Sequence, residues 1–125
     1  MKIHFKISYF TQWGQRLLVS GNLPELGNGE LSKSLSLQYK NGGDWVGEID
    51  VNVNSNEPFN FNYKYILFNE KNAQYTHECG DDRNIDIDKP VADHFFCFDQ
   101  WNSPAFIENT GKYSEGIIFN IDYDE

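Results

Sequence analysis

A stretch in the middle of the chain, FNFNYKYILF at residues 59–68, alternates apolar and polar side chains over most of its length. Successive side chains of a β-strand point to opposite faces of its sheet, so a period of two marks a strand with one buried face. The inward face is expected to carry five apolar and aromatic residues, which are Phe59, Phe61, Tyr63, Tyr65 and Leu67. Asn60, Asn62 and Lys64 should then face outward. This pattern demands a second layer to cover the apolar face.

Shorter runs of the same kind lie on both sides of this stretch. They are separated by turn residues such as Gly27, Gly29 and Pro90, and we find no long amphipathic helix and no internal repeat. The predicted strands lie at residues 3–9, 17–19, 35–37, 45–53, 59–68, 75–78, 84–87 and 94–98. Short strands at this spacing predict an all-β protein, an antiparallel immunoglobulin-like sandwich of about seven to eight strands.

The pattern loosens after Trp101. We therefore predict a sandwich at residues 1–101 and, at 102–125, a linker or C-terminal segment leading to a further domain. The later part of that segment is too apolar for a free tail. It either packs back on the sandwich or begins the next unit, and its apolar residues are Ile117, Ile118, Phe119 and Ile121.

Charge and patterning exclude several kinds of partner. The net charge of -9 argues against nucleic acid and anionic membranes. No apolar run approaches the roughly 20 residues of a membrane span, and the N-terminus alternates where a secretory signal would be continuously apolar. We expect a cytoplasmic protein in which Cys79 and Cys97 are free thiols, although a single bridge stays open. The histidines and cysteines lack metal-ligand spacing, so we expect neither a metal nor a cofactor.

The three tryptophans divide into two kinds. Trp13 stands beside Gly14 where a strand pattern stops, and a large ring at a loop tip either binds a ligand or folds back over the end of the sandwich. Trp45 begins a strand whose alternate residues are apolar, so its ring is expected in the core. Trp101 is expected to cover one end of the sandwich.

Several segments together resemble a known family. They are TQWGQRLLVSGNLPELG at residues 11–27, Trp45 at a strand start, and NYKYILFNEKNAQYTHE at residues 62–78 followed by Arg83. In this order they resemble the starch-binding domains of carbohydrate-binding module family 20, from about Ile3 to Trp101. The first loop is most similar to N-terminal modules of disproportionating-type 4-alpha-glucanotransferases of glycoside hydrolase family 77.

The resemblance implies a non-catalytic module that binds α-1,4-glucan, such as starch, glycogen or maltooligosaccharide. It also implies a parent 4-alpha-glucanotransferase, in which a second starch-binding module and a catalytic domain share the polypeptide. Aromatic rings would cover the apolar C–H faces of the sugars, while amides and charged groups would bond their hydroxyls.

The family carries two sugar sites, and the resemblance assigns residues here to both. In the first, Trp13 falls where the family places a stacking Tyr, and Tyr39 is the second stacking ring. Its hydroxyl contacts would come from Gln12, Lys40, Asn41 and Asp44. The second site is expected to be weak or absent, because Gly29 and His77 stand where the family has two Trp rings. Its residues would be Lys64, Tyr75, His77, Glu78 and Asp82.

Two other functions compete with sugar binding as explanations of this sequence. A glycosidase needs two carboxylates flanking a cleft, and a small sandwich offers little room for one, so we expect no catalytic residues in this segment. A protein-interaction or inter-domain module with a decayed sugar site is the alternative, because exposed aromatic residues also serve protein contacts. A sugar titration separates these readings.

Overall fold

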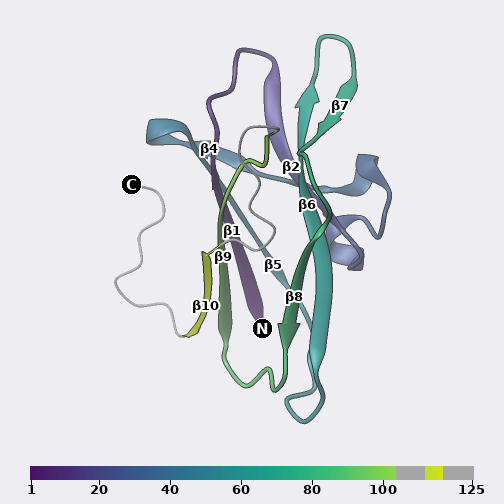
Figure 1. The fold of residues 1–125 in the computed structure, drawn as a ribbon, viewed down its shortest axis with the longest axis vertical. Helices are drawn as coiled ribbons and strands as arrows, with labels where there is room; N and C mark the ends of the chain where they lie inside the picture. Colours follow the sequence, from purple (N-terminus) through teal and green to yellow (C-terminus); the bar gives the residue numbers. More distant parts are fainter. Residues whose placement is uncertain (104–111, 117–125) are drawn as a thin grey trace.

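The computed structural model describes residues 1–103 and 112–116 of the chain. In this part, ten strands form two sheets that pack face to face (Figure 1). Three short 3-10 helices lie in the connections between strands. The predicted all-β sandwich is confirmed. The additional strands lie at residues 38–40, directly after the predicted strand at 35–37, and at residues 112–116, and neither was predicted.

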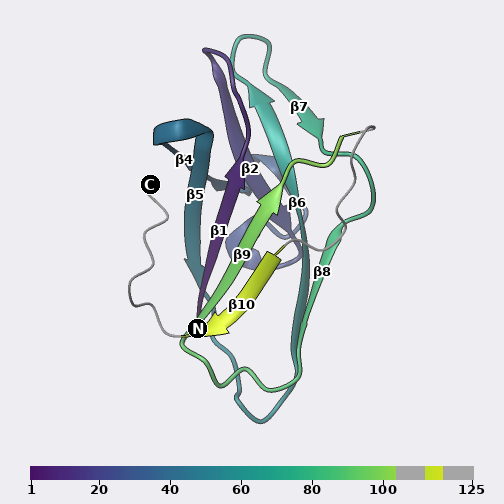
Figure 2. The same ribbon diagram turned by 60° about the vertical axis from the view of Figure 1, so that its left-hand side comes forward.

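The first sheet has the order β10-β9-β1-β5-β4 (Figure 2). Its strands are β1 (Lys2–Ser8), β4 (Gln38–Lys40), β5 (Asp44–Asp50), β9 (His94–Gln100) and β10 (Lys112–Gly116). β1 pairs antiparallel with β5 but parallel with β9, so the first and last of the predicted strands run side by side in the same direction. Alternation within a strand carries no information about the direction of its neighbours, and the sequence therefore gave no sign of this parallel pair.

The second sheet has the order β3-β2-β6-β7, and β8 also pairs with β6. Its strands are β2 (Gln15–Gly21), β3 (Leu35–Ser36), β6 (Phe59–Asn69), β7 (Gln74–His77) and β8 (Arg83–Ile87). β6 is long enough to pair with β8 along its first half and with β7 along its last residues. The 3-10 helices are η1 (Pro24–Leu26), η2 (Leu31–Lys33) and η3 (Asn41–Gly43).

The core lies between the inner faces of the two sheets. Phe61, Tyr63 and Tyr65 of β6 are buried there, which confirms the inward face predicted from the alternation. Trp45 also lies in this core, and Trp101 packs against its edge beside the ring of Tyr9, as expected for both. Burial raises the pKa of the Cys97 thiol, so this group stays protonated and packs as a small apolar side chain.

The predicted strand at residues 35–37 ends at Ser36, because the chain crosses from one sheet to the other there. β3 pairs with β2 in the second sheet, whereas β4 pairs with β5 in the first, and Leu37 is buried between them. Gly47 of β5 makes room for this crossing, because a Cβ atom at that position would lie 2.6 Å from Cδ2 of Leu37. The crossing brings Tyr39 and Lys40 to the edge of the first sheet.

β10 lies in the segment that was predicted to be a linker or C-terminal extension. It pairs antiparallel with β9, from Lys112 opposite Phe98 to Gly116 opposite His94. The chain therefore contributes an edge strand to the first sheet after Trp101. The apolar residues at 117, 118, 119 and 121 lie outside the described residues, and the boundary at residue 101 stays a prediction.

A buried cluster of charged groups links the two sheets. The Arg83 guanidinium on β8 bonds the Glu78 carboxylate through Nε at 3.1 Å and Nη2 at 2.9 Å. On the other sheet it reaches Asp99 of β9, with Nη1 at 3.2 Å from Oδ1. The hydroxyls of Tyr63 and Tyr65 donate to the second Asp99 oxygen at 2.7 and 2.6 Å. Each carboxylate is therefore paired and hydrogen-bonded, as buried charges must be.

Candidate functional site

Among the residues whose burial the structure describes, the most exposed aromatic rings lie on the loop between β1 and β2. Trp13 is 94% exposed and Phe10 is 91% exposed, so neither ring folds back over the sandwich. A tight turn holds Trp13 at the tip: the Gln15 amide donates to the Gln12 carbonyl at 3.0 Å, and the Gln12 amide donates to Oε1 of Gln15 at 2.8 Å. Gly14 permits this turn with a φ of 85°. The predicted residue Gln12 therefore shapes the turn through its backbone.

This loop is joined to the turn that carries the other predicted residues of the first site. The Tyr9 amide donates to the Gly43 carbonyl at 3.0 Å, which places the two turns at the same end of the sandwich (Figures 1 and 2). Asp44 adds a second link, because the Ser8 hydroxyl donates to its Oδ1 at 2.6 Å and Lys6 lies 3.7 Å from its Oδ2. Asp44 thus acts first as a brace between β1 and β5.

Tyr39 is held with one side open to solvent. Its ring meets the buried Trp45 ring edge-on at 5.4 Å and 67°, while 54% of the residue remains exposed. Lys40 is half-buried next to it, and Asn41 at the start of the turn is exposed. The first predicted site therefore comprises exposed rings on two joined turns, with polar groups beside the second ring.

Phe10 was not predicted from the sequence as a residue of the first site. Its signal was present, because it is a large apolar residue directly after the point where the alternation of the first strand ends. At 91% exposure it nearly matches Trp13, and the two rings occupy one short loop. Phe10 therefore joins the candidate residues of the first site.

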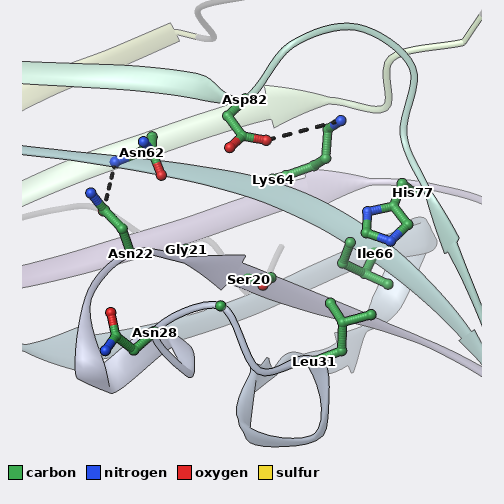
Figure 3. Close-up of a pocket in the computed structure, with 11 residues that line it drawn as sticks. Ser20, Gly21, Asn22, Asn28, Leu31, Asn62, Lys64, Ile66, His77 and Asp82 are labelled. Carbon is green, nitrogen blue, oxygen red and sulfur yellow. Dashed lines mark hydrogen bonds and ion pairs between the residues drawn. The ribbon is translucent and has the colours of Figure 1, made fainter.

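The predicted second site lies on the outer face of the second sheet. An open groove of about 410 Å³ runs there between β2, β6 and the loops that follow β2 and β7 (Figure 3). Three of the predicted residues line it, namely Lys64, His77 and Asp82. The remaining lining residues are Ser20, Gly21, Asn22, Asn28, Gly29, Leu31, Asn62 and Ile66.

Charged and polar groups occupy one side of this groove. Lys64 Nζ donates to the Gly80 carbonyl at 2.8 Å and lies 4.0 Å from Oδ1 of Asp82 (Figure 3). His77 stands opposite Ile66 in the strand register, and Tyr75 stands opposite Phe68, so Tyr75 and His77 share the outer face.

The prediction that Glu78 belongs to the second sugar site is wrong. Its side chain is buried beneath the sheet, where it accepts bonds from Arg83 and from the backbone amides of Tyr65 and Asn102, both at 3.0 Å. Neighbouring residues along a strand point to opposite faces, so the residue after the outward-facing His77 turns inward. Glu78 is therefore not presented to a ligand in the groove.

Gly29 faces open space beside the groove. A Cβ atom there would meet nothing within 4 Å, yet its φ of 91° is a conformation that other residues rarely adopt. The groove consequently has an amide and apolar wall on this side, formed by Asn28 and Leu31, and no stacking ring.

Among the described residues, no helix is long and apolar enough to cross a membrane.

Comparison with known proteins gives one family and several related structures. The starch binding domain family matches residues 1–94. The 4-alpha-glucanotransferase DPE2 of Oryza sativa subsp. japonica is 32% identical over 92 residues, which cover 71% of this chain and 9% of that protein. The chain thus spans less than a tenth of this relative's length.

Two solved structures have a similar fold. The family 15 glucoamylase of Hypocrea jecorina matches with a TM-score of 0.65 and 27% identity, over 82% of this chain and 17% of that one. The family 20 module of the maltotetraose-forming amylase of Pseudomonas saccharophila STB07 matches with a TM-score of 0.61 and 19% identity. That match covers 81% of this chain and 100% of the module.

Proposed function

We propose that this chain, which belongs to the starch binding domain family (carbohydrate-binding module family 20), holds α-1,4-glucan against its exposed aromatic rings. Modules of this family are binding modules and carry out no catalysis. The observation that carries the proposal is Trp13, a large ring that is 94% exposed at the tip of a hydrogen-bonded turn. The bonds of the turn hold the backbone in place, and the exposed ring offers a flat apolar surface.

In the first site, the rings of Trp13 and Tyr39 would stack on the C–H faces of successive sugars. Gln12, Lys40 and Asn41 would bond their hydroxyls, while Asp44 fixes the turn that presents them. Phe10 adds a further apolar surface on the same loop. Because the ligand is neutral, the net charge of -9 neither attracts nor repels it.

The groove residues form a second and weaker site. Lys64 and Asp82 are placed to bond hydroxyls on one side, with His77 and Tyr75 on the same outer face. A single imidazole gives less stacking area than an indole, and Gly29 gives none. We therefore expect the first site to dominate the affinity of the module.

Replacing His77 by tryptophan should strengthen binding in the groove about fivefold, because the larger ring would cover one more sugar face. His77 is exposed, so the new ring needs no repacking of the core. The change is best measured by calorimetry with maltoheptaose in a Trp13→Ala background, which isolates the groove. Gly29→Trp is the matched control: it adds the same ring, but its φ of 91° strains the loop, and we expect no comparable gain. Equal affinity before and after His77→Trp would contradict the placement of the second site.

The likeness to the rice 4-alpha-glucanotransferase supports a proposal for the parent protein. We propose a cytoplasmic 4-alpha-glucanotransferase of glycoside hydrolase family 77, acting on glycogen or starch-derived glucan. A second starch-binding module and the catalytic domain would belong to the same polypeptide. Linking weak modules in one chain raises the effective concentration of the glucan at each of them. Neither nucleic acid nor a membrane is among the proposed partners.

A titration followed by amide NMR spectra tests the proposed function directly. Maltoheptaose should shift the amides of residues 9–15 and 39–44, with a Kd between about 10 μM and 1 mM. A β-1,4-linked glucan of similar length is the control, because its straighter chain does not present successive faces to rings on two turns. Absence of shifts with millimolar maltoheptaose, or equal shifts with both sugars, would reject the glucan function. The aromatic surfaces would then belong to a protein-interaction or inter-domain module.

A further inference from the structure

The outer face of the second sheet carries an aromatic row just beyond the groove. Arg16 of β2, Phe68 of β6 and Tyr75 of β7 are register partners, so they lie in one line across three strands. They point away from the core, to which neither Phe68 nor Tyr75 belongs. We refer to these three residues as the Phe68 row.

The three side chains of the Phe68 row form a continuous surface. The rings of Phe68 and Tyr75 lie 4.8 Å apart at 41°, and the Arg16 guanidinium sits 5.1 Å from the centre of the Phe68 ring. Phe68 is half-buried, whereas Arg16 and Tyr75 are exposed. The row therefore combines two apolar ring surfaces with a cation whose remaining N–H groups can donate hydrogen bonds.

This row continues the groove without a gap in the register. Moving along β6 by two residues leads from Phe68 to Ile66, which is flanked by Leu18 and His77, and then to Lys64, which is flanked by Ser20. Ile66, His77, Lys64 and Ser20 all line the groove. The distance from Lys64 to Phe68 along the strand is about 13 Å, at roughly 3.3 Å per residue.

We propose that the Phe68 row is an additional contact surface for α-glucan, which extends the second site along β6 toward the hairpin between β6 and β7. One glucan chain would enter the groove at Lys64 and Asp82, cross His77, and lay a sugar face against Tyr75 and Phe68. Arg16 would donate to hydroxyls at the far end. This inference rests on the proposed function and adds to it a preference of the second site for long chains.

The chemistry of the row favours a neutral sugar chain over other ligands. An anionic polymer would meet a protein of net charge -9 and only one exposed cation in the row. The groove that adjoins the row is lined by amides, a lysine and a carboxylate, which suit hydroxyl groups. The row contributes the ring surface that Gly29 and His77 do not provide.

Tyr75→Ala should weaken the binding of maltoheptaose to the groove about fivefold and leave that of maltose unchanged, because only the longer chain reaches the row. The measurement is an NMR titration of the full chain with each sugar, following amides of residues 62–66 and 74–77. Tyr75→Phe keeps the ring and should bind as the wild type does. Thr76→Ala is the matched control on the same strand, where the side chain points to the other face.

Three outcomes would overturn parts of this picture in distinguishable ways. If maltoheptaose shifts residues 9–15 and the groove but Tyr75→Ala does not change the groove affinity, the Phe68 row plays no role while the proposed function stands. An equal loss for maltose and maltoheptaose, or a loss in Tyr75→Phe, also rejects the row as a stacking surface. If maltoheptaose shifts no amide in the wild type, the proposed function and this inference fall together.

Discussion

Replacing Arg83 by methionine should lower the free energy of unfolding by about 3–5 kcal/mol. The side chain is fully buried, and methionine fills a similar volume without the charge. This replacement removes the guanidinium that lies beside the buried carboxylates of Glu78 and Asp99. An unpaired buried charge is far costlier than the pair that it replaces. Urea denaturation followed by tryptophan fluorescence measures the change.

The charge on Arg83 persists over the whole experimental range. Burial by itself lowers the pKa of Arg83, but the hydrogen bond to Glu78 and the charges of Asp99 and Glu78 raise it above its usual value on balance. Burial likewise raises the pKa of Tyr63 and Tyr65 well above the usual value, so both hydroxyls remain donors to Asp99. Around neutrality, where Arg83→Met is to be measured, the wild-type cluster therefore contains a charged Arg83 and two protonated tyrosines.

Lys64→Met provides the matched control for Arg83→Met. Lys64 also lies in the second sheet and pairs with a carboxylate, but its partner Asp82 is 4.0 Å away and more than half exposed. An exposed pair of this kind contributes at most about 1 kcal/mol. Adding Glu78→Gln to Arg83→Met should recover part of the lost stability, because it removes the buried charge that Arg83 paired at 2.9 Å. If Arg83→Met costs no more than Lys64→Met, the buried cluster does not hold the two sheets together.

The parts of the fold that depend on local periodicity were predictable from the sequence. The alternation of residues 59–68 placed Phe61, Tyr63 and Tyr65 in the core, because the face of a strand to which a side chain points is set by its position in the strand. The apolar alternate residues of the strand that follows Trp45 likewise predicted that its ring is buried. Turn residues marked where most strands end, since they restrict or relax the backbone locally.

Features set by distant neighbours were not predictable in this way. The parallel pairing of β1 with β9 and the crossing at Leu37 depend on which strands meet in space. Ile66 occupies an outward position of β6 and is nevertheless buried, because it lies at the floor of the groove beside the loop that carries Leu31. In the same way, the buried partner of Glu78 is five residues further along the chain, on the next strand.

The candidate sites also contain some features that follow from the local sequence and others that depend on distant neighbours. The loop position of Trp13 could be predicted from a large ring beside a glycine turn, whereas its exposure could not, because the ring could also have folded back over the sandwich. The role of Asp44 as a brace could not, since Ser8 and Lys6 reach it only through the pairing of β1 with β5. Phe68 stood in the predicted strand, but its ring partner Tyr75 and the cation of Arg16 meet it only when β2, β6 and β7 are in register.

Trp13→Ala should weaken the binding of maltoheptaose to the first site at least about tenfold. Covering one face of an indole removes on the order of 100 Å² of apolar surface from water, which corresponds to about 2 kcal/mol. The ring is 94% exposed, so its removal should leave the stability of the fold unchanged and the result free of folding effects. Calorimetric titration of wild type and variant measures the affinity, and thermal unfolding checks the stability.

Val91→Ala is the matched control for Trp13→Ala, because Val91 is another exposed apolar residue on a loop, 72% exposed and between β8 and β9. Its replacement should change neither the affinity nor the heat of binding. Unchanged affinity in Trp13→Ala would move the main site to the groove, where His77 and Tyr75 would have to supply the stacking. A loss confined to Trp13→Ala would instead place the main site on the loop between β1 and β2, where the turn closed by Gln12 and Gln15 carries this ring at its tip.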